Sequence, residues 1–580
     1  MSKYFNTFFL LIPIILIGQT KTNFIENYNK SKLENLHNKF SKKYKSEKAN
    51  AVKFARKNDI EIEKILPNHN YVELQKIINN EIPIYYKTHN VDAAISTRTN
   101  HLNTGGSTGF NLDGQNMIAY VWDGGHARDT HQEYDGSGGL NRVTIEDVSS
   151  EGGLSLSSHA AHVIGTISAS GYDAAAKGMA PQSELKSYKW NQDLSEATTA
   201  ATSGMLVSNH SYGLLTDNLP DYYFGGYTNE SRDWDQLLFN APNYLMVVAA
   251  GNDGNQNFNG TPLDSNLPQY DKLTGFSTSK NNLVVANAQD ANIDANGNLI
   301  SVSINNSSSQ GPTDDLRIKP DITGNGTGVY STLEDSDTSY GYKTGTSMAS
   351  PNVAGNLLLL QQHYNNLNNK YMRSATLKGI ALHTADDAGI SGPDAIFGWG
   401  LLNAKKAAET ITQKGTKTRI EEFTLNQGET YTTTVQSNNI DNLLASISWT
   451  DPPGTSSTST NSSGADLLND LDIEITQNAN SFYPYRLTGV NSNANDSDNI
   501  KDNFELINIE NPSGTYTITV SHKGSLSNSY QDFSLIVTGI NNLNNCNKPQ
   551  NISVTNINSS SAIINWDDQL SATNGFDYVV

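Results

Sequence analysis

The sequence is poor in cysteine, in long apolar runs and in positive charge. Cys546 is the one cysteine among 580 residues, so no disulfide can form within this chain. The apolar stretch from Tyr4 to Gly18 is shorter than the roughly 20 residues that span a bilayer. Lys and Arg number 39 against 59 Asp and Glu, which gives a net charge of −20. We therefore expect no nucleic-acid partner and no membrane span in the mature chain, and nothing in the sequence fixes an oligomeric state.

A run of small residues precedes one of the longest apolar segments. Gly345-Thr346-Ser347-Met348-Ala349-Ser350-Pro351 leads into Val353–Leu360, which predicts a buried helix. Ser347 then lies in the first turn, where unpaired N–H groups and the helix dipole favour a nearby oxyanion. Serine is also a common helix cap, so Ser347 is a candidate nucleophile only if a base and an orienting group accompany it.

Candidates for both groups occur upstream. The apolar run Met117–Trp122 predicts a buried strand that presents Asp123 at its carboxyl end, and His159 lies in the first turn of a predicted helix capped near Ser157. The chain order is Asp, His, Ser. Chymotrypsin-like enzymes have the order His, Asp, Ser, and α/β-hydrolases place the serine in G-x-S-x-G. The order and the motif both favour the subtilisin arrangement.

The chain resembles the subtilisin-like serine proteases (subtilases) from about residue 91 to residue 409. Four segments carry the resemblance: Val121–Gly125, His159–Gly165, Ala249–Gly254 and Gly345–Pro351. Two departures are modest, because Ala160-Ala161 and Gly124 replace residues that do not react. The resemblance implies a doubly wound, mostly parallel α/β sheet. Its buried-strand candidates are Met117–Trp122, Met205–Ser208, Tyr244–Ala249 and Leu283–Ala286.

The resemblance also implies roles for particular residues. Asp123, His159 and Ser347 would form the catalytic triad, and the Asn252 amide would hold the oxyanion together with the Ser347 N–H. The chemistry would need no cofactor, and the substrates would be proteins or peptides. The substrate pocket would be lined by uncharged residues, which favours large apolar side chains at P1: Ser211, Tyr212, Gly213, Ala249, Ala250 and Gly251.

Simpler interpretations exist for each residue. Asp123 could be an ordinary strand-end carboxylate, and Asn252 a turn residue. His162 lies three residues after His159, but a thermolysin-type metal site needs histidines four apart with a glutamate between them. The conjunction of four motifs in order favours a secreted serine endopeptidase. Two alternatives stay open: a non-catalytic adhesion or carbohydrate-binding protein on a protease-like scaffold, and a non-peptide esterase with the same triad.

The first 90 residues differ from the rest. Lys3 and the apolar stretch after it predict a signal peptide over residues 1–20, hence secretion. Residues 21–90 are predicted as a basic leader or short propeptide, with 12 Lys or Arg against 6 Asp or Glu between Lys21 and Leu66. Leu33, Leu36 and Phe40 have helical spacing. The leader could dock electrostatically on the acidic remainder of the chain, or it could be a solvated charged helix. The predicted catalytic domain follows over residues 91–412.

The residue pattern changes after the catalytic domain. Residues 416–541 contain short alternating strands and are predicted as a β-sandwich that resembles the jelly-roll domain of some extracellular subtilases. In this domain Asp470 and Asp472, together with Asn469, Asp496, Asp498 and Asp502, offer oxygen ligands, and Asp470 and Asp472 predict a structural calcium site. Residues 546–580 resemble the first strands of a fibronectin type III domain, which needs about seven strands, so that domain is predicted to be incomplete.

Overall fold

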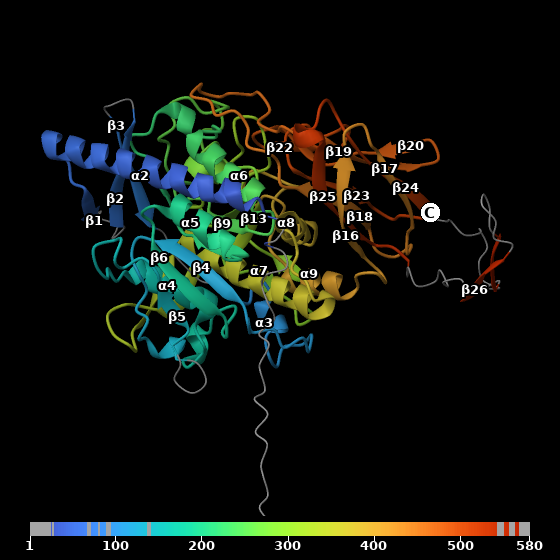
Figure 1. The fold of residues 1–580 in the computed structure, drawn as a ribbon, viewed down its shortest axis with the longest axis horizontal. Helices are drawn as coiled ribbons and strands as arrows, with labels where there is room; N and C mark the ends of the chain where they lie inside the picture. The colour runs from blue at the N-terminus through green and yellow to red at the C-terminus, as the bar shows by residue number, and fades with distance from the viewer. Residues whose placement is uncertain are drawn as a thin grey trace, which may run out of the picture.

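A computed structural model gives the fold of the chain, which Figure 1 draws as a ribbon. It describes residue 25 and residues 28–65, 71–78, 82–88, 94–135, 141–541, 550–555 and 563–567. The predicted signal peptide and most of the predicted fibronectin-like segment lie outside these residues. Within them, no helix combines the length and the apolar character that crossing a membrane requires.

A seven-stranded parallel sheet forms the centre of the molecule. Its strand order is β13-β10-β9-β7-β4-β6-β5, and every neighbouring pair runs parallel. The predicted doubly wound sheet is thereby confirmed, with each predicted strand found within one or two residues of its expected ends. The bounds are β4 (Ile118–Asp123), β5 (Val143–Ile145), β6 (Glu184–Lys189), β7 (Val207–His210), β9 (Leu245–Ala249), β10 (Leu283–Ala288) and β13 (Ile322–Asn325).

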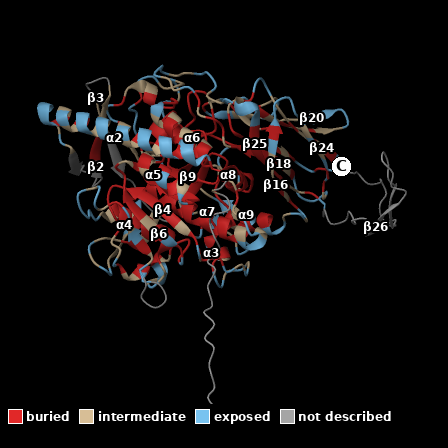
Figure 2. Cartoon of the chain, in the orientation of Figure 1, coloured by how far each residue is buried: buried red, intermediate tan, exposed pale blue. Residues whose placement is uncertain are grey.

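Helices cover both faces of this sheet, because successive strand residues point to opposite sides. Ala119 and Val121 of β4 join one core, together with α4 (Ser158–Ser168), α7 (Thr346–Asn368), α8 (Ser374–His383) and α9 (Ala404–Thr412). Tyr120 and Trp122 join the other, together with α5 (Asp193–Thr202) and α6 (Asn229–Asn240). Figure 2 shows the resulting buried interior beneath helices whose outer faces are exposed.

The leader folds onto the second face. Its helix α2 (Lys30–Asn58) buries Leu33, Leu36 and Phe40 in the same core as Trp234, which confirms the predicted helix. Three strands follow: β1 (Glu63–Ile65), β2 (Tyr71–Ile78) and β3 (Ile82–Thr88). They form a sheet in the order β1-β2-β3-β8, so the leader's last strand pairs with β8 (Tyr212–Leu214) of the body.

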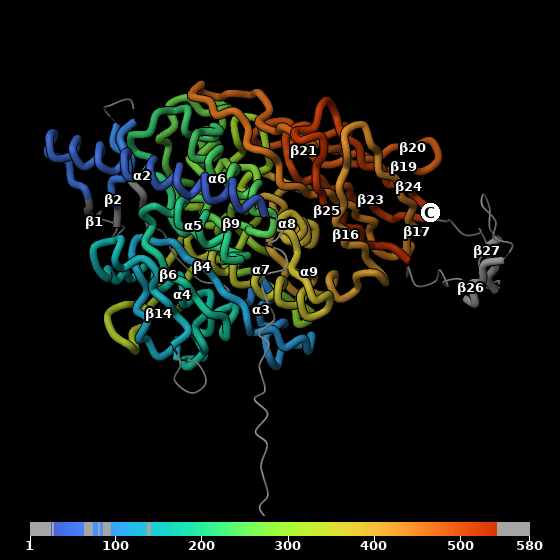
Figure 3. The backbone as a smooth tube through the Cα atoms, in the orientation of Figure 1, coloured from blue at the N-terminus to red at the C-terminus, as the bar shows by residue number. Residues whose placement is uncertain are grey.

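The C-terminal region contains two four-stranded antiparallel sheets around one core, an arrangement consistent with a β-sandwich. Figure 3 traces this region at the end of the molecule opposite α2. The first sheet has the order β16-β25-β18-β23 and the second β17-β24-β19-β20. Their bounds are β16 (Arg419–Asn426), β17 (Tyr431–Gln436), β18 (Leu443–Trp449), β19 (Leu471–Gln477), β20 (Asn480–Phe482), β23 (Phe504–Ile509), β24 (Thr515–His522) and β25 (Tyr530–Thr538).

Smaller elements complete the described chain. They are α3 (Thr99–Leu102) and the hairpins β11 (Asn292–Ile293) with β12 (Leu299–Ser301), β14 (Thr327–Thr332) with β15 (Tyr340–Thr344), β21 (Arg486–Gly489) with β22 (Ser492–Ala494), and β26 (Gln550–Thr555) with β27 (Ile563–Asp567). The last pair lies in the predicted fibronectin-like segment, whose identity stays a prediction.

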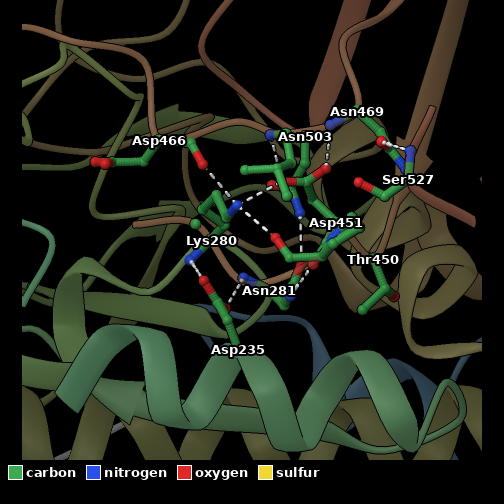
Figure 4. A network of polar contacts seen from close by, with 12 residues as sticks. Asp235, Lys280, Asn281, Thr450, Asp451, Asp466, Asn469, Asn503 and Ser527 are labelled. Carbon is green, nitrogen blue, oxygen red and sulfur yellow. Dashed lines mark hydrogen bonds and ion pairs between the residues drawn. The ribbon is translucent and has the colours of Figure 1, made fainter. Parts of the chain in front are cut away.

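A buried polar network joins the catalytic region to the β-sandwich (Figure 4). The Lys280 ammonium group forms an ion pair with Asp451 and also donates to the carbonyl oxygens of Pro452 and Asp466, each at 2.7 Å. Asn281 exchanges two hydrogen bonds of 2.8 Å with the Asp451 backbone. Since Lys280 and Asp451 are both shielded from solvent, the two regions pack as one unit.

Candidate active site

Asp123 and His159 come together at the carboxyl edge of the parallel sheet. Asp123 ends β4 and is 1% exposed, and His159 stands in the first turn of α4. The His159 Nδ1–H donates to the carboxylate, with Nδ1 2.6 Å from Oδ1 and 2.8 Å from Oδ2 of Asp123. Ser157 caps this helix, since its hydroxyl accepts from the backbone N–H groups of His159 and Ala160. The carboxylate therefore fixes which imidazole nitrogen carries the proton.

Ser347 occupies the first turn of α7, as the sequence predicts. Its hydroxyl donates to the Ser211 carbonyl oxygen at 2.8 Å, and the Ser211 hydroxyl donates to the Ser347 carbonyl oxygen at 2.6 Å. Asn209 extends this link, since it donates to the Ser211 hydroxyl and accepts from that of Ser350. The end of β7 thus holds the start of α7, which fixes the serine at the edge where β4 and β7 end.

Asn252 is oriented by the residue before the serine. Its Oδ1 accepts from the Thr346 N–H at 2.9 Å and from the Thr346 hydroxyl at 3.1 Å. The Thr346 hydroxyl in turn accepts from the Gly251 N–H at 3.1 Å. Because Oδ1 is engaged, the Nδ2–H₂ group is the end of the amide that remains to donate to another acceptor.

The six predicted pocket residues differ in their surroundings. Ala249 and Ala250 are buried, and Ala250 packs against Leu273. Gly213 faces open space, since a Cβ built on it would have no neighbour within 4 Å. Tyr212, in contrast, is fully buried: its hydroxyl donates to Asp193 at 2.7 Å, and its ring lies edge-on to that of Trp190. The Tyr212 side chain therefore belongs to the core, and only its backbone can line a pocket.

The sequence is similar to known proteins over the region that contains this site. The sequence model of the Subtilase family matches residues 37–400, more than half of the chain. The chain belongs to the subtilase family. Subtilisin DY of Bacillus licheniformis is 26% identical over 297 residues, which cover 51% of this chain and 92% of that protein.

One curated relative is similar over a short segment, and one solved structure over about half of the chain. An extracellular serine protease of Serratia marcescens is 40% identical over 68 residues, which cover 12% of this chain and only 6% of that protein. Among solved structures, the self-cleaved protease domain of PatA is 20% identical with a TM-score of 0.38, and the match covers 52% of this chain and 98% of that domain.

In this subtilase the second histidine of the His159 segment has a structural role. His162 is fully buried, and its Nε2 lies 3.2 Å from the carbonyl oxygens of Val329 and Gly341. Burial lowers the pKa of His162 to about 3. The neutral ring therefore ties α4 to the β14–β15 hairpin and is not placed as a metal ligand beside His159.

The leader reaches the predicted substrate pocket. Strand β3 runs antiparallel to β8, with Lys87 opposite Gly213 and Thr88 opposite Tyr212. The sequence gives no signal for this pairing, because the two strands are more than 120 positions apart. An edge strand of this kind offers its N–H and C=O groups to any extended chain laid beside it.

The calcium site expected at Asp470 and Asp472 stays a prediction, and the structure places a lysine among its carboxylates. The Lys523 ammonium group lies 2.5 Å from Asp472 and from Asp498, and 3.5 Å from Asp470. The ammonium group therefore supplies positive charge next to the carboxylates that were expected to bind calcium. Within the described ranges, no three or more His, Cys, Asp or Glu side chains gather as a metal site.

Proposed function

We propose that this subtilase is a serine endopeptidase that hydrolyses peptide bonds through an acyl-enzyme. The observation that carries the proposal is the hydrogen-bonded pair of Asp123 and His159 at the sheet edge where Ser347 also stands. In the proposed mechanism, the Ser347 hydroxyl attacks the scissile carbonyl carbon while His159 Nε2 takes its proton. Asp123 holds the imidazole in the required tautomer and stabilises the imidazolium.

The tetrahedral intermediate is proposed to be held by two donors. One is the backbone N–H of Ser347, which is free because first-turn N–H groups have no intrahelical partner. The other is Asn252 Nδ2, whose opposite oxygen is fixed by Thr346. His159 then protonates the leaving amine, and a water molecule repeats the cycle on the acyl-enzyme. No cofactor takes part in these steps.

The proposed substrates are proteins or peptides bound in extended form along β8. Ser211, Gly213, Ala249, Ala250 and Gly251 would contribute to the pocket for the P1 side chain, with Tyr212 through its backbone only. These residues carry no charge, so a buried Lys or Arg at P1 would find no partner there. We therefore propose a preference for large apolar P1 residues.

The leader over residues 21–90 is proposed to be a propeptide that blocks this site. Two observations support this: β3 occupies the β8 edge, and charged contacts attach the leader to the body. Lys43 forms an ion pair of 2.6 Å with Asp233. Glu73 accepts hydrogen bonds from the indole of Trp190 at 2.7 Å and from Asn191 at 3.1 Å. A substrate could use β8 only after β3 has left.

We further propose that the protein is secreted. The support is the apolar stretch between Tyr4 and Gly18 and the local similarity to an extracellular serine protease of Serratia marcescens. The remaining domain assignments are proposed with the same boundaries: a catalytic domain over 91–412, a β-sandwich over 416–541 and a fibronectin-like segment over 546–580.

Digestion of a diverse peptide library tests this function. The chain with its leader removed should cleave internal peptide bonds, mostly after large apolar residues, and Ser347→Ala should not. Hydrolysis of esters but not of peptides would favour the esterase alternative. Failure to hydrolyse either, together with no labelling by a fluorophosphonate, would favour the non-catalytic scaffold.

A further inference from the structure

A second pair of histidine and aspartate joins the segments that carry Asp123 and His159. His126 follows Asp123 by three positions and is 0% exposed, and Asp147 is 4% exposed. His126 Nε2 lies 2.8 Å from Asp147 Oδ1, and the backbone N–H of Ser155 donates to His126 Nδ1 at 3.1 Å. Because Nδ1 accepts a hydrogen bond, the proton of the neutral ring is on Nε2 and is donated to Asp147. The proposed mechanism uses neither side chain.

The backbone of His126 contacts the segment that leads into α4. Its N–H donates to the Ser155 carbonyl oxygen at 2.6 Å, and its carbonyl oxygen accepts from the Ser157 N–H at 2.9 Å. A Cβ built on Gly125 would lie 2.7 Å from the Ser155 carbonyl oxygen and 2.8 Å from Ser157 Cβ, so a glycine is needed for this close approach. Ser157 is the N-cap of α4, whose first turn carries His159. The two hydrogen bonds therefore tie the backbone after the triad aspartate to the start of the helix that carries the triad histidine.

Asp147 connects the same histidine to the neighbouring strand. Its Oδ2 accepts from the Lys189 N–H at 2.8 Å. Lys189 ends β6, where it is the register partner of Asp123 on β4, and the Trp190 N–H donates to the Asp123 carbonyl oxygen at 2.7 Å. A closed ring of contacts therefore runs from Asp123 through β6, Asp147 and His126 to α4, whose histidine bonds Asp123 again.

We propose that His126 is a positioning residue that sets, through Asp147, the geometry of the hydrogen bond between Asp123 and His159. This role rests on the proposed function, because it is a role in the same triad. A neutral imidazole has one acceptor and one donor, which match the Ser155 N–H on one side and the Asp147 carboxylate on the other. Without the ring, both buried groups lose a partner and the two segments can move apart. A misplacement of about 1 Å at a catalytic group can cost about a hundredfold in rate.

The test compares His126→Leu with His126→Gln, each produced as the full chain with the leader removed after folding. Leucine fills a similar space but neither accepts nor donates, so kcat for peptide hydrolysis should fall about tenfold to a hundredfold with little change in KM. Glutamine keeps an acceptor and a donor, so its kcat should exceed that of the leucine variant by about threefold or more, the effect of about one hydrogen bond.

His383→Leu is the matched control. This buried histidine also has two partners, the hydroxyl groups of Ser446 and Thr538, but it lies between α8 and the β-sandwich, outside the ring of contacts. The control should lower the melting temperature as His126→Leu does, because both remove a buried ring and its hydrogen bonds. Its kcat should equal that of the parent. The comparison therefore separates a role in positioning from a general loss of stability.

Asp147→Asn tests the connection from the other side. Both carboxylate oxygens accept, from His126 and from the Lys189 N–H, whereas an amide has one oxygen and must lose one of these bonds. Its kcat should fall as in His126→Leu, and the double variant should lose no more than the larger single effect, because the two side chains act as a unit. Proton NMR with isotope-labelled histidine reads the result directly. The signal of the His159 Nδ1–H donated to Asp123 should shift or broaden in both variants and stay unchanged in the control.

Several results would overturn this role. They are a kcat in His126→Leu equal to that of His383→Leu, equally low kcat in the leucine and glutamine variants, and additive losses in the double variant. If His126→Leu does not fold, Asp147→Asn and the NMR signal decide by the same criteria. Failure of all the His126 and Asp147 variants to fold, with a folded His383→Leu, would make the pair a requirement for folding and refute the positioning role. A parent that neither hydrolyses peptides nor reacts with a fluorophosphonate would refute the proposed function and this role together, whereas an active parent with unchanged variants would refute this role alone.

Discussion

Lys280→Met tests whether the β-sandwich stabilises the catalytic region or is only loosely attached to it. The substitution keeps the aliphatic stem but removes an ammonium group that is 0% exposed. It leaves the Asp451 carboxylate buried, where among the described residues it accepts only from the N–H groups of Leu468 and Asn469, at 2.9 and 2.8 Å. Removing one partner of a buried pair costs about 3–5 kcal/mol, because the other charge stays buried without compensation. We expect a loss of unfolding free energy in that range.

Urea unfolding of the Ser347→Ala chain, followed by tryptophan fluorescence, measures this loss. Lys523→Met is the matched control, because its ammonium group also bonds aspartates but is 44% exposed, and exposed pairs contribute about 0–1 kcal/mol. Lys280→Met combined with Asp451→Leu should recover most of the loss, since an apolar pair replaces the buried charges. If Lys280→Met costs no more than Lys523→Met, the interface does not depend on this pair.

Two further predictions concern the site and the leader. Asn252→Leu should lower kcat by about a hundred- to a thousandfold with little change in KM, because the proposed oxyanion donor is lost. Asn252→Asp should lower kcat at least as much. Near-normal turnover in Asn252→Asp would instead indicate that Asn252 only shapes a turn. Burial opposes ionisation of Glu73, but the charges of Lys48 and Lys189 outweigh burial and lower the Glu73 pKa. The ionised Glu73 therefore stabilises leader docking above its ordinary pKa, and this contribution is lost as the pH falls through the lowered pKa. Amide exchange in α2, corrected for intrinsic rates, should therefore speed up in acid, and Glu73→Gln should raise exchange at pH 7; unchanged exchange in both experiments would contradict a docking role for Glu73.

Local pattern predicts the elements that carry the proposed catalytic residues. The apolar run before Asp123, the cap at Ser157 and the small residues around Ser347 are short-range signals, and the strand and helices they predict are present. Their common edge follows from the general behaviour of parallel sheets, whose functional groups gather at the carboxyl ends of the strands.

Tertiary contacts account for what the sequence does not predict. Tyr212 is predicted to line the substrate pocket, yet strand alternation turns its ring into the core. Lys523 contacts Asp472 from a strand end about 50 positions away, and the sequence does not predict this contact. The pairing of β3 with β8 likewise joins distant segments, and no local periodicity encodes it.

The central claim is that Ser347 is the nucleophile and that His159 activates it. Its most direct test is labelling of the leader-free protein with a fluorophosphonate, followed by mass spectrometry of the digested chain. One label per molecule should be found on Ser347, with none on Ser347→Ala and labelling strongly slowed in His159→Ala. A label on another residue, or equal labelling of Ser347→Ala, would contradict the account.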